Sequence, residues 1–167
     1  QLARQAAIDG CREELRKLDE AYFDDLKYPP RGSGLDVVYR PNHGLAHSLR
    51  KAVLLPMVLK QYRELDESYG ACEEMVTTMQ MAMIFGVSGR ESDVGRSVSE
   101  ADHDKYRRLS REAFDEYARS MSIDEEYRTV CVEALGTMYT DSPCEPHAST
   151  TTLVRRIFER THDLDLF

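Results

Sequence analysis

The chain has 167 residues and carries 30 acidic against 22 basic side chains, which gives a formal net charge of −8 with neutral histidines. This length suits one compact domain with a real core, and a hydrophobic content of 41% with 31% charged residues is typical of globular proteins. The acidic balance argues against general nucleic-acid binding, which requires a basic surface. No run approaches the roughly 20 apolar residues of a membrane span, so neither nucleic acid nor a membrane is an expected partner.

The two ends of the sequence suggest a piece of a longer protein. The chain begins at Gln1 without an initiator methionine, and it stops at Phe167 inside a helical pattern. No signal-peptide pattern of basic, apolar and small residues precedes the first helix. We therefore expect residues 1–167 to form one domain cut from a larger chain.

Helical periodicity dominates the sequence and predicts about six helices. The expected helices cover residues 2–26, 44–66, 71–86, 100–120, 122–139 and 149–162. Prolines and glycines at 28–34, and two prolines at 141–146, separate neighbouring helices because neither residue type continues a helix well. With no internal repeat and no reliable strand pattern, the expected fold is all-α, a single compact helical domain.

Two of these helices carry further expectations. Apolar residues surround most of the 44–66 segment, which predicts a central, mostly buried helix kinked at Pro56. The 71–86 segment includes Cys72, for which we expect a buried free thiol. Its methionines are typical of flexible core filling rather than of a ligand set; they are Met75, Met79, Met81 and Met83.

The most informative segment is residues 40–50, which read RPNHGLAHSLR. His43 and His47 are four positions apart and so share one face of a helix. A helix N-terminus flanked by Arg40 and Arg50 suits a phosphate, because free N–H groups and cations both point at it. A histidine there serves as a nucleophile on phosphorus, a general acid or a metal ligand. The alternative is structural, with His47 hydrogen-bonded in the core and His43 as a polar cap.

A second segment, residues 89–93, reads GRESD and places a cation and two carboxylates in a glycine-flanked loop. A carboxylate such as Glu91 in that position can orient an imidazole and raise its basicity. Arg90 supplies a positive charge beside it. The alternative is a solvated charged loop without a catalytic role.

The remaining histidines differ in their helical phase. His162 extends an apolar stripe that includes Leu153 and Phe158, so its side chain is expected to point inward, where it is either structural or catalytic. His103 stands between two aspartates and is expected to face solvent without a catalytic role. His147 follows Pro146 in a loop and is a weaker site candidate.

Three motifs together resemble the phosphodiesterase domain of the SidE family of bacterial effectors: RPNHGLAH, the Gly-Arg-Glu loop and the terminal HDLDL. The resemblance spans about residues 39–166. It implies an all-α domain that acts on ubiquitin carrying ADP-ribose on an arginine. Such a domain cleaves the pyrophosphate, releases AMP and leaves phosphoribosyl on ubiquitin or on a substrate serine. Related members remove phosphoribosyl-ubiquitin from serine.

The resemblance also implies roles for single residues. His43 would be the nucleophile that forms a transient phosphoramidate, Glu91 would orient it, and His162 would be the general acid that protonates the departing AMP. Two imidazoles in opposite protonation states suit such a two-step transfer. The residues expected to contact the substrate are Arg40, Asn42, His47, Arg50 and Arg90.

By the same resemblance, no metal or other cofactor is expected, and the partner is ADP-ribosylated or phosphoribosyl-linked ubiquitin with its AMP or ADP-ribose moiety. The resemblance also implies a secreted effector that acts in the host cytosol. Nothing in this sequence resembles the mono-ADP-ribosyltransferase domain that prepares the substrate in full-length members. This segment alone is therefore not expected to modify unmodified ubiquitin.

Two other functions fit parts of the pattern. An HD-type metal-dependent phosphohydrolase is also all-α and would use His43, His47, His162 and Asp163 as ligands. In such enzymes, however, the His-Asp pair should stand in the middle of the ligand order rather than at its end. The other alternative is a non-catalytic helical module that binds a nucleotide or a protein.

Overall fold

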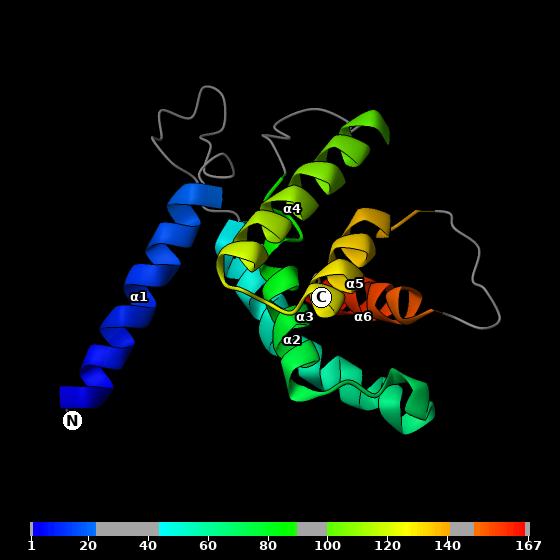
Figure 1. The fold of residues 1–167 in the computed structure, drawn as a ribbon, viewed down its shortest axis with the longest axis horizontal. Helices are drawn as coiled ribbons and strands as arrows, with labels where there is room; N and C mark the ends of the chain where they lie inside the picture. The colour runs from blue at the N-terminus through cyan, green and yellow to red at the C-terminus, as the bar shows by residue number, and fades with distance from the viewer. Residues whose placement is uncertain (1, 23–43, 90–99, 141–148, 166–167) are drawn as a thin grey trace.

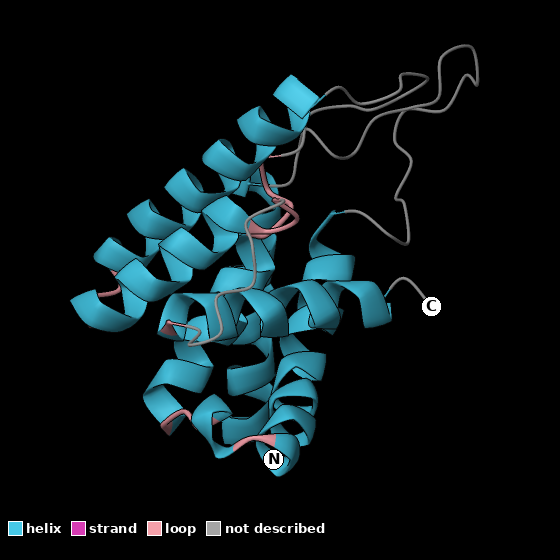
Figure 2. Cartoon of the chain, turned by 90° about the vertical axis from the view of Figure 1, so that its right-hand side faces the viewer, coloured by secondary structure: helices cyan, strands magenta, loops and turns pink. Residues whose placement is uncertain are grey.

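A computed structural model describes residues 2–22, 44–89, 100–140 and 149–165 of the chain. The helices are α1 (Leu2–Tyr22), α2 (Gly44–Leu65), the short 3₁₀ helix η2 (Glu67–Tyr69), α3 (Glu73–Phe85), α4 (Glu100–Ser120), α5 (Glu125–Thr137) and α6 (Thr150–Asp165). Over these ranges the chain forms no strand (Figure 2), so the expected all-α fold of about six helices is confirmed.

Four helices, α2, α3, α5 and α6, pack together in the middle of the molecule, and α4 lies against α3 and α5 (Figure 1). The N-terminal part of α1 stands apart from this group. The C-terminal end of α1 joins the group through Tyr22, whose ring packs edge-on against Phe85 with 5.0 Å between ring centroids.

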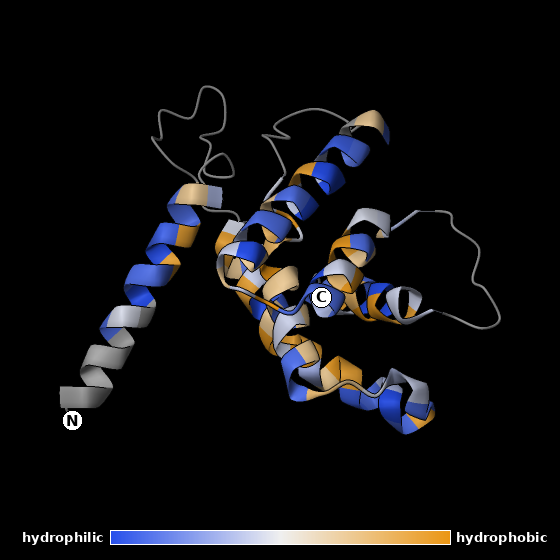
Figure 3. Ribbon diagram, in the orientation of Figure 1, coloured by the Kyte–Doolittle hydropathy of each residue, from blue (hydrophilic) through white to orange (hydrophobic). Residues whose placement is uncertain are grey.

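The core is built from apolar side chains that the helical phase turns inward. Its largest fully buried apolar members are Phe85, Phe114, Phe158, Leu55, Met79, Met83 and Ile157. Each such side chain contributes roughly 1.5–3 kcal/mol of hydrophobic stabilisation. Three of the four methionines of α3 are buried, which confirms that they fill the core. The outer side of α4 is predominantly hydrophilic (Figure 3).

Two expectations about burial are wrong. On α2, Val53 and Met57 remain 71% and 65% exposed, because α3 and α6 pack against the other side of this helix. Cys72 is an exposed free thiol rather than a buried one. The reason is that α3 begins at Glu73, so Cys72 becomes its N-cap and its sulfur accepts a hydrogen bond from the backbone N–H of Met75.

The connection between α4 and α5 shows why these helices end and begin where they do. Ser122 adopts a left-handed conformation with φ 54°, and the N–H of Ile123 bonds the carbonyl of Ala118 at 3.0 Å. This is the Schellman arrangement that ends a helix. Asp124 then caps α5 by accepting the N–H of Glu126 at 2.9 Å. The short turn keeps α5 against α4, and the C-terminal end of α5 contributes to the site described next.

Candidate active site

The start of α2 is set by Gly44, which has a φ of +77°. Glycine adopts this left-handed conformation without the penalty that a Cβ atom brings. Immediately before Gly44 in the sequence stands His43. Five predicted site residues lie outside the described residues: Arg40, Asn42, His43, Arg90 and Glu91. The structure places the other three, which are His47, Arg50 and His162.

These three residues meet where α2 crosses the C-terminal end of α6, and Asp165 joins them there. His47 Nδ1 lies 2.5 Å from Asp165 Oδ2. The Arg50 guanidinium donates two hydrogen bonds to the same carboxylate, from Nε to Oδ1 and from Nη2 to Oδ2, both at 2.8 Å. The side chains of His47 and Asp165 are 0% and 4% exposed, whereas that of Arg50 is 44% exposed. A bidentate ion pair of this kind fixes the carboxylate firmly.

The environment holds His47 in its neutral form. Burial, and after it the nearby positive charge of Lys51, lower the pKa of His47 to about 3, although the hydrogen bond that His47 donates to Asp165 acts in the opposite direction. For Asp165, burial alone would raise the pKa, but hydrogen bonds from Arg50 and His47 outweigh burial and lower it. At neutral pH the site therefore contains an aspartate anion and a neutral imidazole.

His162 lies between two aromatic rings. Its ring packs edge-on against His47, with centroids 5.0 Å apart and ring planes at 81°. On another side it packs against Tyr139, with centroids 5.7 Å apart. His162 and Asp165 are three positions apart on α6, so both reach the same side of the helix. The side chain of His162 thus points inward, as its helical phase predicted.

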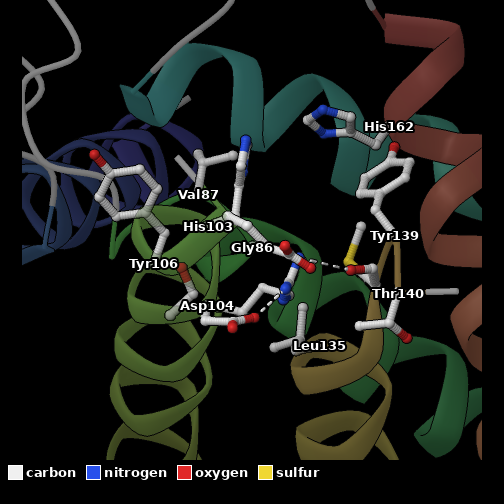
Figure 4. A pocket seen from close by; sticks show the side chains of 13 residues that line it. Gly86, Val87, His103, Asp104, Tyr106, Leu135, Tyr139, Thr140 and His162 are labelled. Atoms are coloured by element: carbon white, nitrogen blue, oxygen red, sulfur yellow. Dashed lines mark hydrogen bonds and ion pairs between the residues drawn. The ribbon is translucent and has the colours of Figure 1, made fainter. Parts of the chain in front are cut away.

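A cavity of about 590 Å³ opens beside His162. Its walls come from α4, from the ends of α3 and α5 and from His162 of α6. Figure 4 shows His162 and Tyr139 on one side of this cavity and Tyr106 and His103 of α4 on the other. A volume of this order is typical of sites for small-molecule ligands.

Tyr139 has an unusual backbone at the edge of this cavity. Its φ is 56°, a left-handed conformation that is uncommon for a bulky side chain. Hydrogen bonds hold it in place, because its N–H donates to Glu159 at 2.7 Å and its hydroxyl donates to Asp163 at 2.8 Å. Burial and the hydrogen bond to Asp163 both raise the pKa of the Tyr139 phenol, which stays protonated. Strain of this kind gathers at functional sites.

The chain leaves α3 and crosses directly over α4 at Gly89. A Cβ atom at Gly89 would lie 2.5 Å from the backbone N of Ser110 and from the backbone O of Tyr106, which no real contact allows. The N–H of Gly89 also donates to the Ser110 hydroxyl at 2.9 Å. Gly89 immediately precedes Arg90 and Glu91 in the sequence. The crossing therefore fixes the point from which that segment starts.

The comparisons with known proteins identify the family. The sequence model of the SidE phosphodiesterase (PDE) domain matches residues 17–167. The chain belongs to the SidE phosphodiesterase family. Searches of curated proteins and of solved structures gave no match.

The remaining histidines of this SidE-family domain are His103 and His147. His103 is exposed, as predicted, although it also lines the cavity, and His147 lies outside the described residues.

Within the described ranges no three His, Cys, Asp or Glu side chains gather closely enough to hold a metal ion. Asp163, one of the ligands of the HD hypothesis, accepts the Tyr139 hydroxyl. In the same ranges, no helix has the length and apolar character needed to cross a membrane.

Three residues of this SidE-family site were missed by the sequence reasoning. Lys51 is fully buried and follows His47 by four positions, so its spacing from His47 was a usable signal. Asp165 follows His162 by three positions in the HDLDL motif, which gave a similar signal. No sequence signal pointed to Tyr139, because the helical pattern of the sequence continues to this residue. Only the structure shows its left-handed backbone.

Proposed function

We propose that this domain is a phosphodiesterase that acts on ubiquitin carrying ADP-ribose on an arginine side chain. It cleaves the pyrophosphate, releases AMP and transfers the phosphoribosyl group to serine or to water, or it removes phosphoribosyl-ubiquitin from serine. The observation that carries this proposal is the family match over residues 17–167. The cavity beside His162 supports it, because the site needs room for a nucleotide.

In the first step, a ring nitrogen of His43 attacks the phosphorus that bears the ribose attached to ubiquitin. The new P–N bond forms as the P–O bond to AMP breaks, and His162 gives its proton to the departing AMP oxygen. Glu91 orients His43 through the proton on the other ring nitrogen. In the second step, a serine hydroxyl or water attacks phosphorus, the P–N bond breaks and the released proton returns to His162.

The charge on the transferred phosphate has to be stabilised by the chain itself. We assign this task to the basic residues of the motifs, Arg40, Arg50 and Arg90, together with Asn42. The position of Arg50 supports this role, because its half-exposed guanidinium binds the Asp165 carboxylate, which also contacts His47. His47 is fully buried and bonded to Asp165, which favours a supporting role over direct contact with the substrate.

Family membership also supports a partner and a place of action. SidE domains act in ubiquitin modification, so the proposed partner is modified ubiquitin, and the proposed place is the host cytosol after secretion. Because the sequence contains no segment that resembles an ADP-ribosyltransferase, ADP-ribosylated ubiquitin has to be supplied to this domain.

Mass spectrometry of the products tests the proposal. The protein is incubated with purified ADP-ribosylated ubiquitin, with and without a serine-containing peptide. We expect AMP together with phosphoribosyl-ubiquitin when water is the acceptor, or a ubiquitin-linked peptide when serine is. A folded wild-type protein that releases no AMP and leaves phosphoribosyl-linked serine intact would contradict the proposal.

A further inference from the structure

A continuous set of contacts links the surface of α2 to His162. It begins at the half-exposed Arg50, whose two hydrogen bonds of 2.8 Å hold the Asp165 carboxylate. Asp165 Oδ2 lies 2.5 Å from His47 Nδ1. The His47 ring in turn packs edge-on against His162 at 5.0 Å. Every link after Arg50 is made by side chains that are buried or partly buried.

The hydrogen bond to Asp165 decides which nitrogen of His47 carries the proton. An ionised carboxylate only accepts hydrogen bonds, so Nδ1 of His47 has to be the donor. A neutral imidazole has one N–H, and its Nε2 therefore carries a lone pair. This Nε2 is buried and has no hydrogen-bond partner among the described residues.

This arrangement sets both the orientation and the charge of the ring beside His162. If the proton were on Nε2 instead, the Asp165 carboxylate would face an unprotonated nitrogen, and the ring would rotate away. If His47 were a cation, it would repel a protonated His162 at 5.0 Å. The burial of the ring and, after it, the neighbouring Lys51 both oppose that cation. The position of His162 thus depends on Asp165 through the ring of His47.

We propose that Asp165 is a positioning residue, which fixes the Nδ1–H tautomer of His47 and thereby holds His162 in place for proton transfer. This inference rests on the proposed function, because it takes His162 as the general acid. Carboxylates that orient a metal-bound histidine typically contribute 10–100-fold to metal affinity or activity, and Asp165 orients His47 through the same kind of hydrogen bond. Asp165 is assigned a contribution of this size.

The test combines NMR on the free protein with kinetics. In ¹⁵N-histidine-labelled wild-type protein, His47 is expected to show one protonated Nδ1 and one unprotonated Nε2. In Asp165→Ala, this pattern changes and the ring signals of His162 shift, whereas those of the exposed His103 do not. With ADP-ribosylated ubiquitin, we expect kcat to fall about 10–100-fold, with KM changed far less than kcat.

A matched control removes a similar carboxylate elsewhere. Asp115 on α4 is also held by two arginines, Arg128 and Arg119, and these ion pairs involve no histidine. Asp115→Ala is expected to lower stability and to leave the His47 tautomer and kcat as in the wild type. If Asp165→Ala does not fold, the isosteric Asp165→Asn takes its place, and its kcat is expected to follow the fraction of His47 that keeps the Nδ1–H form.

Each result decides the inference. An unchanged His47 tautomer, unmoved His162 signals, or a changed tautomer with wild-type kcat would overturn it. If the wild type shows no turnover at all, the proposed function fails, and the NMR measurements alone decide whether Asp165 sets the tautomer of His47 and the position of His162.

Discussion

At the scale of single residues, the site is governed by charges that are buried or nearly buried. Lys51 is fully buried on α2, although lysines are almost never found there. Its positive charge lies close enough to His47 to lower the pKa of that histidine. Burial and Lys51 together keep His47 neutral, while the ionised Asp165 supplies the neighbouring negative charge.

Replacing Lys51 with methionine tests this balance. Methionine has a similar length but no charge, so Lys51→Met removes the repulsion that disfavours protonated His47. We expect the pKa of His47 to rise from about 3, while burial, the larger cause, keeps it below the ordinary 6.5. NMR titration of His47 measures the change. The control is Lys60→Met, at an exposed position of the same helix. An equal pKa of His47 in the wild type and in Lys51→Met would contradict the electrostatic account.

At the scale of secondary-structure elements, helices could be predicted from apolar periodicity to within a few residues. The match is closest for α4, whose bounds Glu100–Ser120 agree with the prediction. The start of α3 was missed by two residues because Cys72, a residue type uncommon at N-caps, acts as one. The exposed face of α2 was also missed, since a helix that is apolar around most of its circumference does not reveal which side its neighbours leave open.

The crossing of Gly89 over α4 makes a prediction at this scale. A Cβ atom in Gly89→Ala would meet the α4 backbone at 2.5 Å, so the chain has to move. We expect a loss of stability of about 1–3 kcal/mol, together with lower activity because the segment that bears Glu91 starts from this point. Urea unfolding and AMP release measure the two effects.

Gly10 on α1 provides the control for that substitution. A Cβ atom at Gly10 meets nothing within 4 Å, so Gly10→Ala is expected to be neutral or to stabilise the helix by up to about 1 kcal/mol. Equal effects of the two substitutions would show that Gly89 is not needed for a close approach.

At the scale of the whole molecule, His47 couples folding to pH. The pKa of His47 is about 3 in the folded protein against an ordinary value of 6.5, so below pH 6.5 the unfolded chain binds more protons. The contribution of His47 to the free energy of unfolding is therefore fully present above pH 6.5. It is lost as the pH falls toward 3, with a slope of up to about 1.4 kcal/mol per pH unit. The lowered pKa of Asp165 acts in the same direction at low pH.

Unfolding by urea at several pH values between 7 and 4 checks this dependence. In His47→Gln the steep slope is expected to flatten, because the group that takes up the proton on unfolding is gone. His103→Gln, at an exposed histidine, is expected to keep the wild-type slope. A wild-type protein whose stability is constant across this interval would contradict the account of His47.

The site of the whole molecule could be predicted from the sequence only in part. The motifs identified His47, Arg50 and His162, and the structure brings these three together. The contact of His47 with Asp165 joins positions that are 118 residues apart, so no local spacing reveals it. It depends on how α2 and α6 cross, which is set by packing of the whole core. Tyr139 reaches the site for the same reason.

The central claim, that His162 is the general acid of a phosphodiesterase, is tested most directly by single-turnover AMP release. Wild-type protein, His162→Asn and His103→Asn are each mixed in excess with ADP-ribosylated ubiquitin, and AMP is measured over time. Both histidines line the same cavity. We expect His162→Asn to slow AMP release by about 10²–10⁴-fold and His103→Asn to slow it far less. Wild-type rates in His162→Asn would contradict the account.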